Sequence, residues 1–260
     1  MSAATLRAPL HKNATEDDTM RPRLATILLA LAPILACDDP ASTEGENGVF
    51  DFQFTTGTHG WTTGFADYPA GEEQRYQLAA GHEKLPAPLD QSRRGILLSG
   101  MNHSDDLFMF LKRQLTGLQP ETEYDIEISV EFATNAAQGC VGVGGSEGES
   151  VVIKAGASAA EPDTVVDSNG MVRLNLDKGN QLEPGTNAIV LGNIANSSDD
   201  CHNAPYELKT LDSGDQELTA TTDKDGRLWL FVGSESGFEA KTTLYYTRIR
   251  AELTPRESDT

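Results

Sequence analysis

The chain has 260 residues, and its 40 acidic side chains outnumber 20 basic ones, which gives a formal net charge of −20. A surface this negative repels phosphate backbones, so nucleic-acid binding is excluded from the expected functions. With 38% hydrophobic residues the chain is long and apolar enough to bury the core of one large domain.

The first 36 residues have the pattern of an export signal. Arg21 and Arg23 precede an apolar run from Leu24 to Ala36. This run is shorter than the roughly 20 residues that a membrane-spanning helix needs, and Pro33 interrupts it, so a signal peptide is predicted. Because a basic region normally opens such a signal, we expect translation to start at Met20.

The signal ends in Ile34-Leu35-Ala36-Cys37, which resembles the bacterial lipobox. The resemblance implies that residues 1–36 are removed and that a lipid on Cys37 anchors the protein to a membrane, on its periplasmic face or at the cell surface. Residues 37–48 are acidic and rich in small side chains, which predicts a flexible tether between the lipid and the folded domain.

Two further cysteines, Cys140 and Cys201, remain if Cys37 carries a lipid. In an oxidising compartment this even pair predicts a disulfide. Closing a loop of about 60 residues would stabilise the fold by about 4 kcal/mol in the chain-entropy model. The alternative is a pair of reduced, buried thiols in a cytosolic protein, which leaves the apolar run at 24–36 unexplained.

Strand patterns are frequent after Val49. In Tyr124–Phe132 apolar side chains alternate with polar ones, which indicates a strand with one buried face. Short continuous apolar runs at 107–111, 151–153 and 228–232 indicate strands buried on both faces. Glycine-containing turns separate the runs. We therefore predict one all-β, antiparallel, jelly-roll-like β-sandwich over residues 49–254, followed by a disordered tail at 255–260.

The segment from Leu115 to Tyr124 (LTGLQPETEY) resembles the tyrosine corner of fibronectin type III domains and carbohydrate-binding jelly rolls. In that motif the phenol bonds to the backbone upstream and fixes a crossing between the two sheets. The resemblance implies a β-sandwich and says nothing about function.

An aromatic segment precedes this motif, with Trp61, Phe65 and Tyr68 spaced through a chain rich in glycine and threonine. Sugar rings stack on such side chains, while His59 and Asp67 would bond their hydroxyl groups. The alternative is that the three rings anchor a long loop to the core.

Two loops each combine a pair of carboxylates with an imidazole. The first contains His103, Asp105 and Asp106, and the second contains Asp199, Asp200 and His202. Calcium takes carboxylate and carbonyl oxygens, and imidazoles suit zinc, so a structural calcium is one expectation. The alternative is that these side chains cap turns by bonding to nearby backbone N–H groups.

Three stretches resemble a family of uncharacterised secreted bacterial proteins, many of them with lipoprotein signals: residues 50–68, 103–118 and 139–145. The resemblance implies export and a β-sandwich, and it brings no activity. The opening at 50–61 and the tyrosine corner are also similar to galactose-binding-like jelly rolls.

The sequence therefore favours an exported, membrane-anchored, non-catalytic protein that binds a glycan or another extracellular ligand. One alternative is a secreted polysaccharide hydrolase or lyase that uses His103, Asp105, Asp106 and His202. The other is a structural envelope lipoprotein without a ligand.

Overall fold

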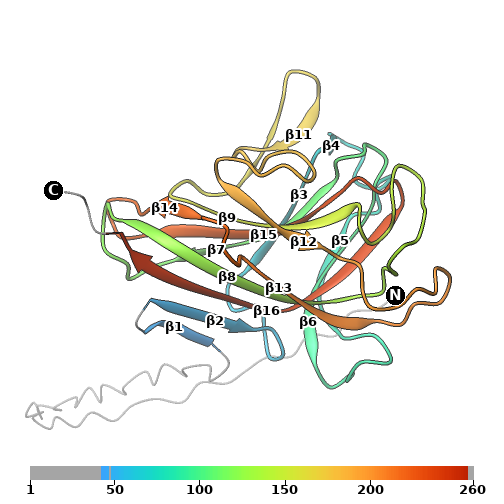
Figure 1. The fold of residues 1–260 in the computed structure, drawn as a ribbon. Helices are drawn as coiled ribbons and strands as arrows, with labels where there is room; N and C mark the ends of the chain where they lie inside the picture. Colours follow the sequence, from blue (N-terminus) through green and yellow to red (C-terminus); the bar gives the residue numbers. More distant parts are fainter. Residues whose placement is uncertain (1–41, 47, 257–260) are drawn as a thin grey trace, which may run out of the picture. The chain divides into compact units, whose positions relative to one another are not determined.

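The computed structural model describes residues 42–46 and 48–256. Every regular element in this part of the chain is a β-strand, so the all-β prediction is confirmed (Figure 1). No helix long and apolar enough to cross a membrane occurs among these residues.

The strands are β1 (Ser42–Glu46), β2 (Val49–Gln53), β3 (Thr62–Ala66), β4 (Tyr68–Pro69), β5 (Ala79–Lys84), β6 (Arg94–Met101), β7 (Phe108–Leu115), β8 (Glu123–Thr134), β9 (Val151–Ser158), β10 (Thr164–Val166), β11 (Met171–Leu174), β12 (Ala188–Asn193), β13 (Glu207–Asp212), β14 (Thr219–Thr221), β15 (Leu228–Ser236) and β16 (Lys241–Pro255).

The larger of the two main sheets is built around β16, which has 15 residues. One edge of β16 pairs first with β6 and then with β2, and its other edge pairs with β8 (Figure 1). β1 and β5 complete one side of this sheet, and β13 and β14 pair with β8. The second main sheet has the order β12-β9-β15-β7-β3, and all of its pairs are antiparallel.

The main core lies between these two sheets and takes side chains from both. In β15 the side chains of Leu228, Leu230 and Val232 belong to this core, while Phe231 belongs to a second cluster. Because side chains alternate along a strand, the second cluster lies on the other face of the five-stranded sheet. This confirms the prediction that the apolar run at 228–232 is buried on both faces.

The second cluster is built from rings that lie over glycines. Phe110 lies against Gly64, where an added Cβ would be 2.3 Å from the ring. Phe231 lies equally close to Gly156. The rings therefore pack flat across neighbouring strands because those glycines carry no side chain.

Residues 159–187, which we call the cover segment, lie over this face of the five-stranded sheet. They contain β10 and β11, and β11 pairs with β4 to make a small third sheet. Leu174 and Leu176 of the cover segment pack against the second cluster. The cover segment thus gives the sheet its second buried face.

The predicted tyrosine corner is present. The phenol oxygen of Tyr124 accepts a hydrogen bond from the backbone N–H of Gln119 at 2.9 Å. Tyr124 itself is 3% exposed. The motif therefore fixes the start of β8, as the resemblance implied.

The predicted tether differs from the structure in its second half. Residues 42–46 form β1 and pair antiparallel with β2, so this part of the tether is a strand. Backbone pairing with an adjacent strand overrides the polar composition that predicted flexibility. The signal peptide, Cys37 and most of the predicted tail lie outside the described residues.

Candidate functional site

A polar cavity of about 180 Å³ lies at the junction of the cover segment with the sheet. Its walls come from the loop between β3 and β4, the loop before β7 and the cover segment, and they carry both acidic and basic side chains. The lining residues are Asp67, Asp106, Arg173, Leu174, Leu176, Asp177, Lys178, Gly179 and Asn180.

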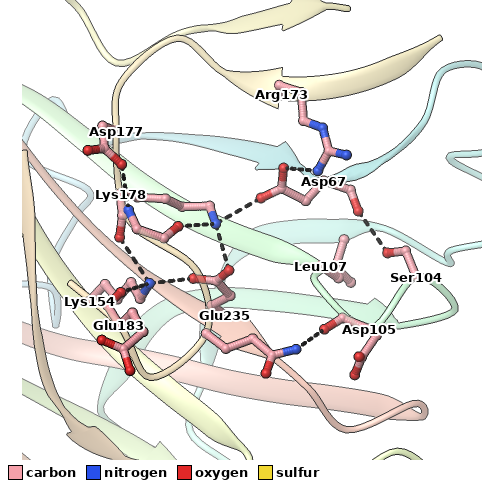
Figure 2. Close-up of polar contacts among 12 residues, drawn as sticks. Asp67, Ser104, Asp105, Leu107, Lys154, Arg173, Asp177, Lys178, Glu183 and Glu235 are labelled. Atoms are coloured by element: carbon pink, nitrogen blue, oxygen red, sulfur yellow. Dashed lines mark hydrogen bonds and ion pairs between the residues drawn. The ribbon is translucent and has the colours of Figure 1, made fainter. Parts of the chain in front are cut away.

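A buried ion pair lies beside this cavity (Figure 2). The Nζ atom of Lys154 in β9 lies 2.7 Å from Oε2 of Glu235 in β15, and both side chains are 0% exposed. The Lys154 ammonium also donates to the backbone carbonyls of Lys178 at 2.9 Å and Glu183 at 3.0 Å. The pair therefore ties the cover segment to two adjacent strands of the sheet.

Lys178 extends the pair into a network that reaches the cavity. Its Nζ lies 2.7 Å from Glu235 Oε1 and 3.0 Å from Asp67 Oδ2. Arg173 donates to Asp67 Oδ1 at 2.8 Å (Figure 2). Arg173 also lies 3.5 Å from Asp167. Asp67 thus sits between two cations, one of them nearly buried.

Buried charges of this kind cost several kcal/mol each in lost hydration, and their mutual attraction repays this only when their geometry is good. A network of four charged side chains that are at most 9% exposed is therefore weak evidence for stability. Fixed charges beside a cavity are better evidence for a binding site, because binding groups must be held in place.

The backbone at Asp67 has a left-handed conformation, with φ of 65°. Its N–H donates to the carbonyl of Val172 at 2.7 Å, and its carbonyl accepts from the Ser104 hydroxyl at 2.7 Å (Figure 2). Aspartate tolerates this conformation better than most residues. These bonds aim the carboxylate between Arg173 and Lys178.

Asp106 is the carboxyl group of the cavity whose electrostatic surroundings are least favourable. Burial raises its pKa, and the negative charges of Glu235 and Asp67 raise it further. Lys178 and a hydrogen bond from Gln181 oppose these effects without cancelling them. The negative charge of Asp106 is therefore only partly balanced by its neighbours, and its carboxylate can accept a hydrogen bond from a ligand in the cavity.

Asp177 has a different role, because it organises the loop of the cover segment. Its carboxylate accepts hydrogen bonds from the N–H groups of Gly179 at 3.0 Å and Thr186 at 2.9 Å, and from the Thr186 hydroxyl at 3.1 Å. These bonds to the charged form lower the pKa of Asp177.

The aromatic platform expected around Trp61 does not form, and this expectation is corrected. Trp61 is 3% exposed and makes edge-on contacts with Phe52 and Phe54. Tyr68 is 7% exposed and lies beside Tyr76. The rings are core anchors, because burying such large apolar surfaces stabilises the fold more than exposing them.

The other three residues of that segment are in different places. Phe65 packs on the main core as a partly buried side chain. His59 donates from Nε2 to the Gln53 carbonyl at 2.8 Å, outside the cavity. Asp67 is the residue of this prediction that lines the cavity.

The two loops with paired carboxylates do not share the cavity. Asp106 lines it, whereas Asp199, Asp200 and His202 do not. Asp200 caps a turn by accepting from the N–H groups of His202 and Asn203. The turn-capping alternative therefore holds for Asp200.

In the first of these loops, His103 packs edge-on against Tyr76 at 5.3 Å. Asp105 lines a smaller neighbouring cavity of about 140 Å³. Within the described residues no group of three or more His, Cys, Asp or Glu side chains is arranged to hold a metal ion. Structural calcium stays a prediction.

The predicted disulfide is present between Cys140 and Cys201, which have a sequence separation of 61 and a Cα–Cα distance of 5.6 Å. It joins the loop after β8 to the loop before β13.

Sequence reasoning missed four residues of the network: Lys154, Arg173, Lys178 and Glu235. Two of them left a signal, because Lys154 interrupts an apolar strand and Glu235 ends one. A charged residue at a position where the apolar pattern of a strand predicts burial indicates a buried partner of opposite charge. Arg173 and Lys178 lie in a segment without such a pattern.

No family model and no curated protein matches the chain. Among solved structures it is similar to a putative sugar binding protein from Bacteroides thetaiotaomicron, with 9% identity and a TM-score of 0.37 over 84% of this chain and 96% of that one. It is similar to the mannan-recognising module TmCBM27 at 9% identity and a TM-score of 0.35, over 82% and 99% of the two chains. The xylan-binding module CBM15 gives 12% identity and a TM-score of 0.34, over 82% and 100%.

Two longer proteins are matched in part. The chain spans 21% of the length of a bacteriophage CBA120 tailspike protein 4 chain and 64% of the length of a chain with β-sandwich carbohydrate-binding modules. At these identities and TM-scores the likeness assigns neither a ligand nor a site, so the functional argument rests on the residues of this chain.

Proposed function

We propose that this protein is an exported, lipid-anchored, non-catalytic β-sandwich that binds a carbohydrate in the cavity lined by Asp67, Asp106 and Arg173. The observation that carries the proposal is the polar cavity itself, with charged groups held in place by a buried network. Sugars need such walls, because each hydroxyl group both donates and accepts hydrogen bonds.

The lining supplies both kinds of partner. Oδ1 of Asp67 and the carboxylate of Asp106 accept hydrogen bonds, and the Arg173 guanidinium donates them. Hydrogen bonds to charged groups contribute more than neutral ones, about 1.5–3 kcal/mol each. The apolar wall, Leu174 and Leu176, can contact the C–H face of a ring.

The size and the charge of the site restrict the ligand. A cavity of about 180 Å³ is smaller than the pockets of about 300–1,000 Å³ that enclose drug-sized ligands, so it holds about one sugar residue of a longer chain. The net charge of −20 repels polyanions. Neutral or positively charged glycans are therefore the favoured class.

The test is calorimetry of the full chain with manno-, xylo-, galacto- and gluco-oligosaccharides, followed by variants with the glycan that binds. We expect Asp106→Asn and Arg173→Gln each to weaken binding by about 10- to 100-fold, the equivalent of one charge-assisted hydrogen bond. Asp199→Asn makes the same change of charge away from the cavity and should bind as the wild type does. Equal loss in all three variants, or no binding by any glycan, would refute the proposal.

Export and anchoring have a separate test, because Cys37 lies outside the described residues. The Cys37→Ser variant should lose its lipid and move from the membrane fraction to the soluble fraction. An unchanged distribution would contradict lipid anchoring and leave the carbohydrate site untouched.

Polysaccharide hydrolysis is a second candidate, favoured by the presence of two carboxyl groups on one cavity. Burial raises the pKa of Asp106, which suits a general acid, while Asp67 lies between two cations. The test is an assay for reducing ends released from a polysaccharide. If the wild type releases them, and Asp106→Asn still binds the glycan but releases none, the protein is an enzyme. His103 and His202, which the sequence suggested for catalysis, do not line this cavity.

A further inference from the structure

Lys178, Asp67 and Glu235 have an arrangement that goes beyond ion pairing. Lys178 Nζ lies 3.0 Å from Asp67 Oδ2 and 2.7 Å from Glu235 Oε1. The three side chains are 9%, 6% and 0% exposed. An amine, a carboxyl group and a second carboxylate thus meet at a largely buried site beside the cavity.

Lys178 Nζ and Asp67 Oδ2 form a close ion pair inside the protein. Oδ2 is buried, and Nζ lies 3.0 Å from it. Cγ, the atom that the amine would attack, is bonded directly to Oδ2, so the nucleophile and the electrophile are already neighbours.

We propose that Lys178 and Asp67 form an intramolecular amide bond, with Glu235 as the group that carries the protons. Glu235 takes a proton from the Lys178 ammonium and passes it to Asp67 Oδ2, and the neutral Nζ then attacks Cγ of the resulting carboxylic acid. Oδ2 receives a second proton from Nζ by way of Glu235 and leaves as water. The ammonium and the carboxylate become an amide and one water, and Glu235 is regenerated as a carboxylate.

Arg173 completes the chemistry of this site. Its guanidinium donates to Asp67 Oδ1, the oxygen that is retained, at 2.8 Å. Negative charge develops on that oxygen when the amine attacks, and a fixed donor at this distance stabilises it. Nucleophile, electrophile, proton carrier and oxyanion donor are therefore all in place.

The low polarity of the site favours the product. Lys178 Nζ lies 5.2 Å from the centre of the Phe108 ring, and amide formation removes two charges from these surroundings. Neither remaining charge loses all its partners, because Glu235 keeps Lys154 at 2.7 Å and Arg173 keeps Asp167 at 3.5 Å. Well-oriented intramolecular reactions reach effective molarities of about 10⁵ M or more.

Peptide mapping of the purified full chain tests the bond directly. Trypsin cannot cleave after an acylated lysine, so Lys178 should remain inside peptide 174–209, covalently joined to the peptide that contains Asp67. The joined species should weigh one water less than its two peptides together after reduction of the disulfide. Cleavage after Lys178 with a free Asp67 peptide would overturn the proposal, as would a link between Lys154 and Glu235 instead.

Intact mass provides the second measurement and avoids any assumption about N-terminal processing. The wild type and Glu235→Gln are purified in the same way and their masses are compared. Once the mass change of the substitution itself is subtracted, the wild type should be lighter by one water. Lys178→Met should also lack the loss, whereas Lys224→Met, which changes an exposed lysine, should retain it. If the masses of the wild type and Glu235→Gln differ only by the substitution, the proposed role of Glu235 is refuted. Because Asp106 takes no part in amide formation, Asp106→Asn tests the carbohydrate site alone and peptide mapping tests the bond alone, so either proposal can fail without the other.

Discussion

Asp177 stabilises the loop of the cover segment through hydrogen bonds that need its charged form. These bonds lower its pKa below the ordinary value of 3.8, so their contribution is present at neutral pH and is lost as the pH falls through the lowered pKa. We expect Asp177→Asn to speed amide exchange of Gly179 and Thr186 by about tenfold at neutral pH, as the loss of one charge-assisted bond predicts. In acid the wild type should approach the variant. Equal exchange in the two proteins at neutral pH would contradict this role.

Lys154 and Glu235 form a pair that water does not reach. Lys154→Met removes one of the two cations that Glu235 contacts in this buried site, so it should lower the free energy of unfolding by about 3 kcal/mol in urea titrations. Adding Glu235→Leu should recover part of this loss, since it removes the carboxylate that has lost a partner. Lys112→Met is the matched control, because its partner Glu161 is 50% exposed and such pairs contribute about 1 kcal/mol or less. Equal losses from Lys154→Met and Lys112→Met would show that burial of the pair does not matter.

The strand β9 depends on a residue without a side chain at Gly156. An added Cβ there would lie 2.3 Å from the Phe231 ring and 2.2 Å from the Asn187 carbonyl oxygen. Gly156→Ala should therefore cost about 1–3 kcal/mol of stability, because the strand and ring must move apart. Gly57→Ala, where nothing lies within 4 Å, should leave the melting temperature nearly unchanged. A similar melting temperature for both variants would argue against this tight approach.

At the scale of the whole molecule, the Cys140–Cys201 disulfide closes a loop of 61 positions. In the chain-entropy model it contributes about 4 kcal/mol, which for a domain of this size is roughly 10 °C in melting temperature. The double variant Cys140→Ser, Cys201→Ser should melt that much lower, and reductant should have no further effect on it. Cys37→Ser should melt as the wild type does. A wild type whose melting temperature is insensitive to reductant would contradict the contribution of this bond.

Several features of the fold were predictable because they depend on local pattern. The alternation at 124–132 and the run at 228–232 correctly indicated strands, and the tyrosine corner correctly indicated a sandwich. The two cysteines after Cys37 indicated their pairing through redox chemistry and an even count. Each of these signals lies within a short stretch of chain or in a simple count.

The candidate site was predictable in part. Asp67 and Asp106 were among the predicted residues, although the roles given to them were sugar contact beside an aromatic platform and metal binding. Trp61 belongs to the core. The sequence could not show this, because an exposed platform and a buried anchor have the same sequence pattern. The cavity between Asp67 and Arg173 depends on residues more than a hundred positions apart.

By itself, the sequence determined the all-β class, the disulfide partners and the acidic surface, because composition and short-range periodicity carry that information. The tertiary structure alone decided that Lys154 and Glu235 meet without water and that Lys178 of the cover segment reaches Asp67. The physical reason is that an ion pair depends on distance in space. Folding over the five-stranded sheet brings together side chains that no sequence pattern links.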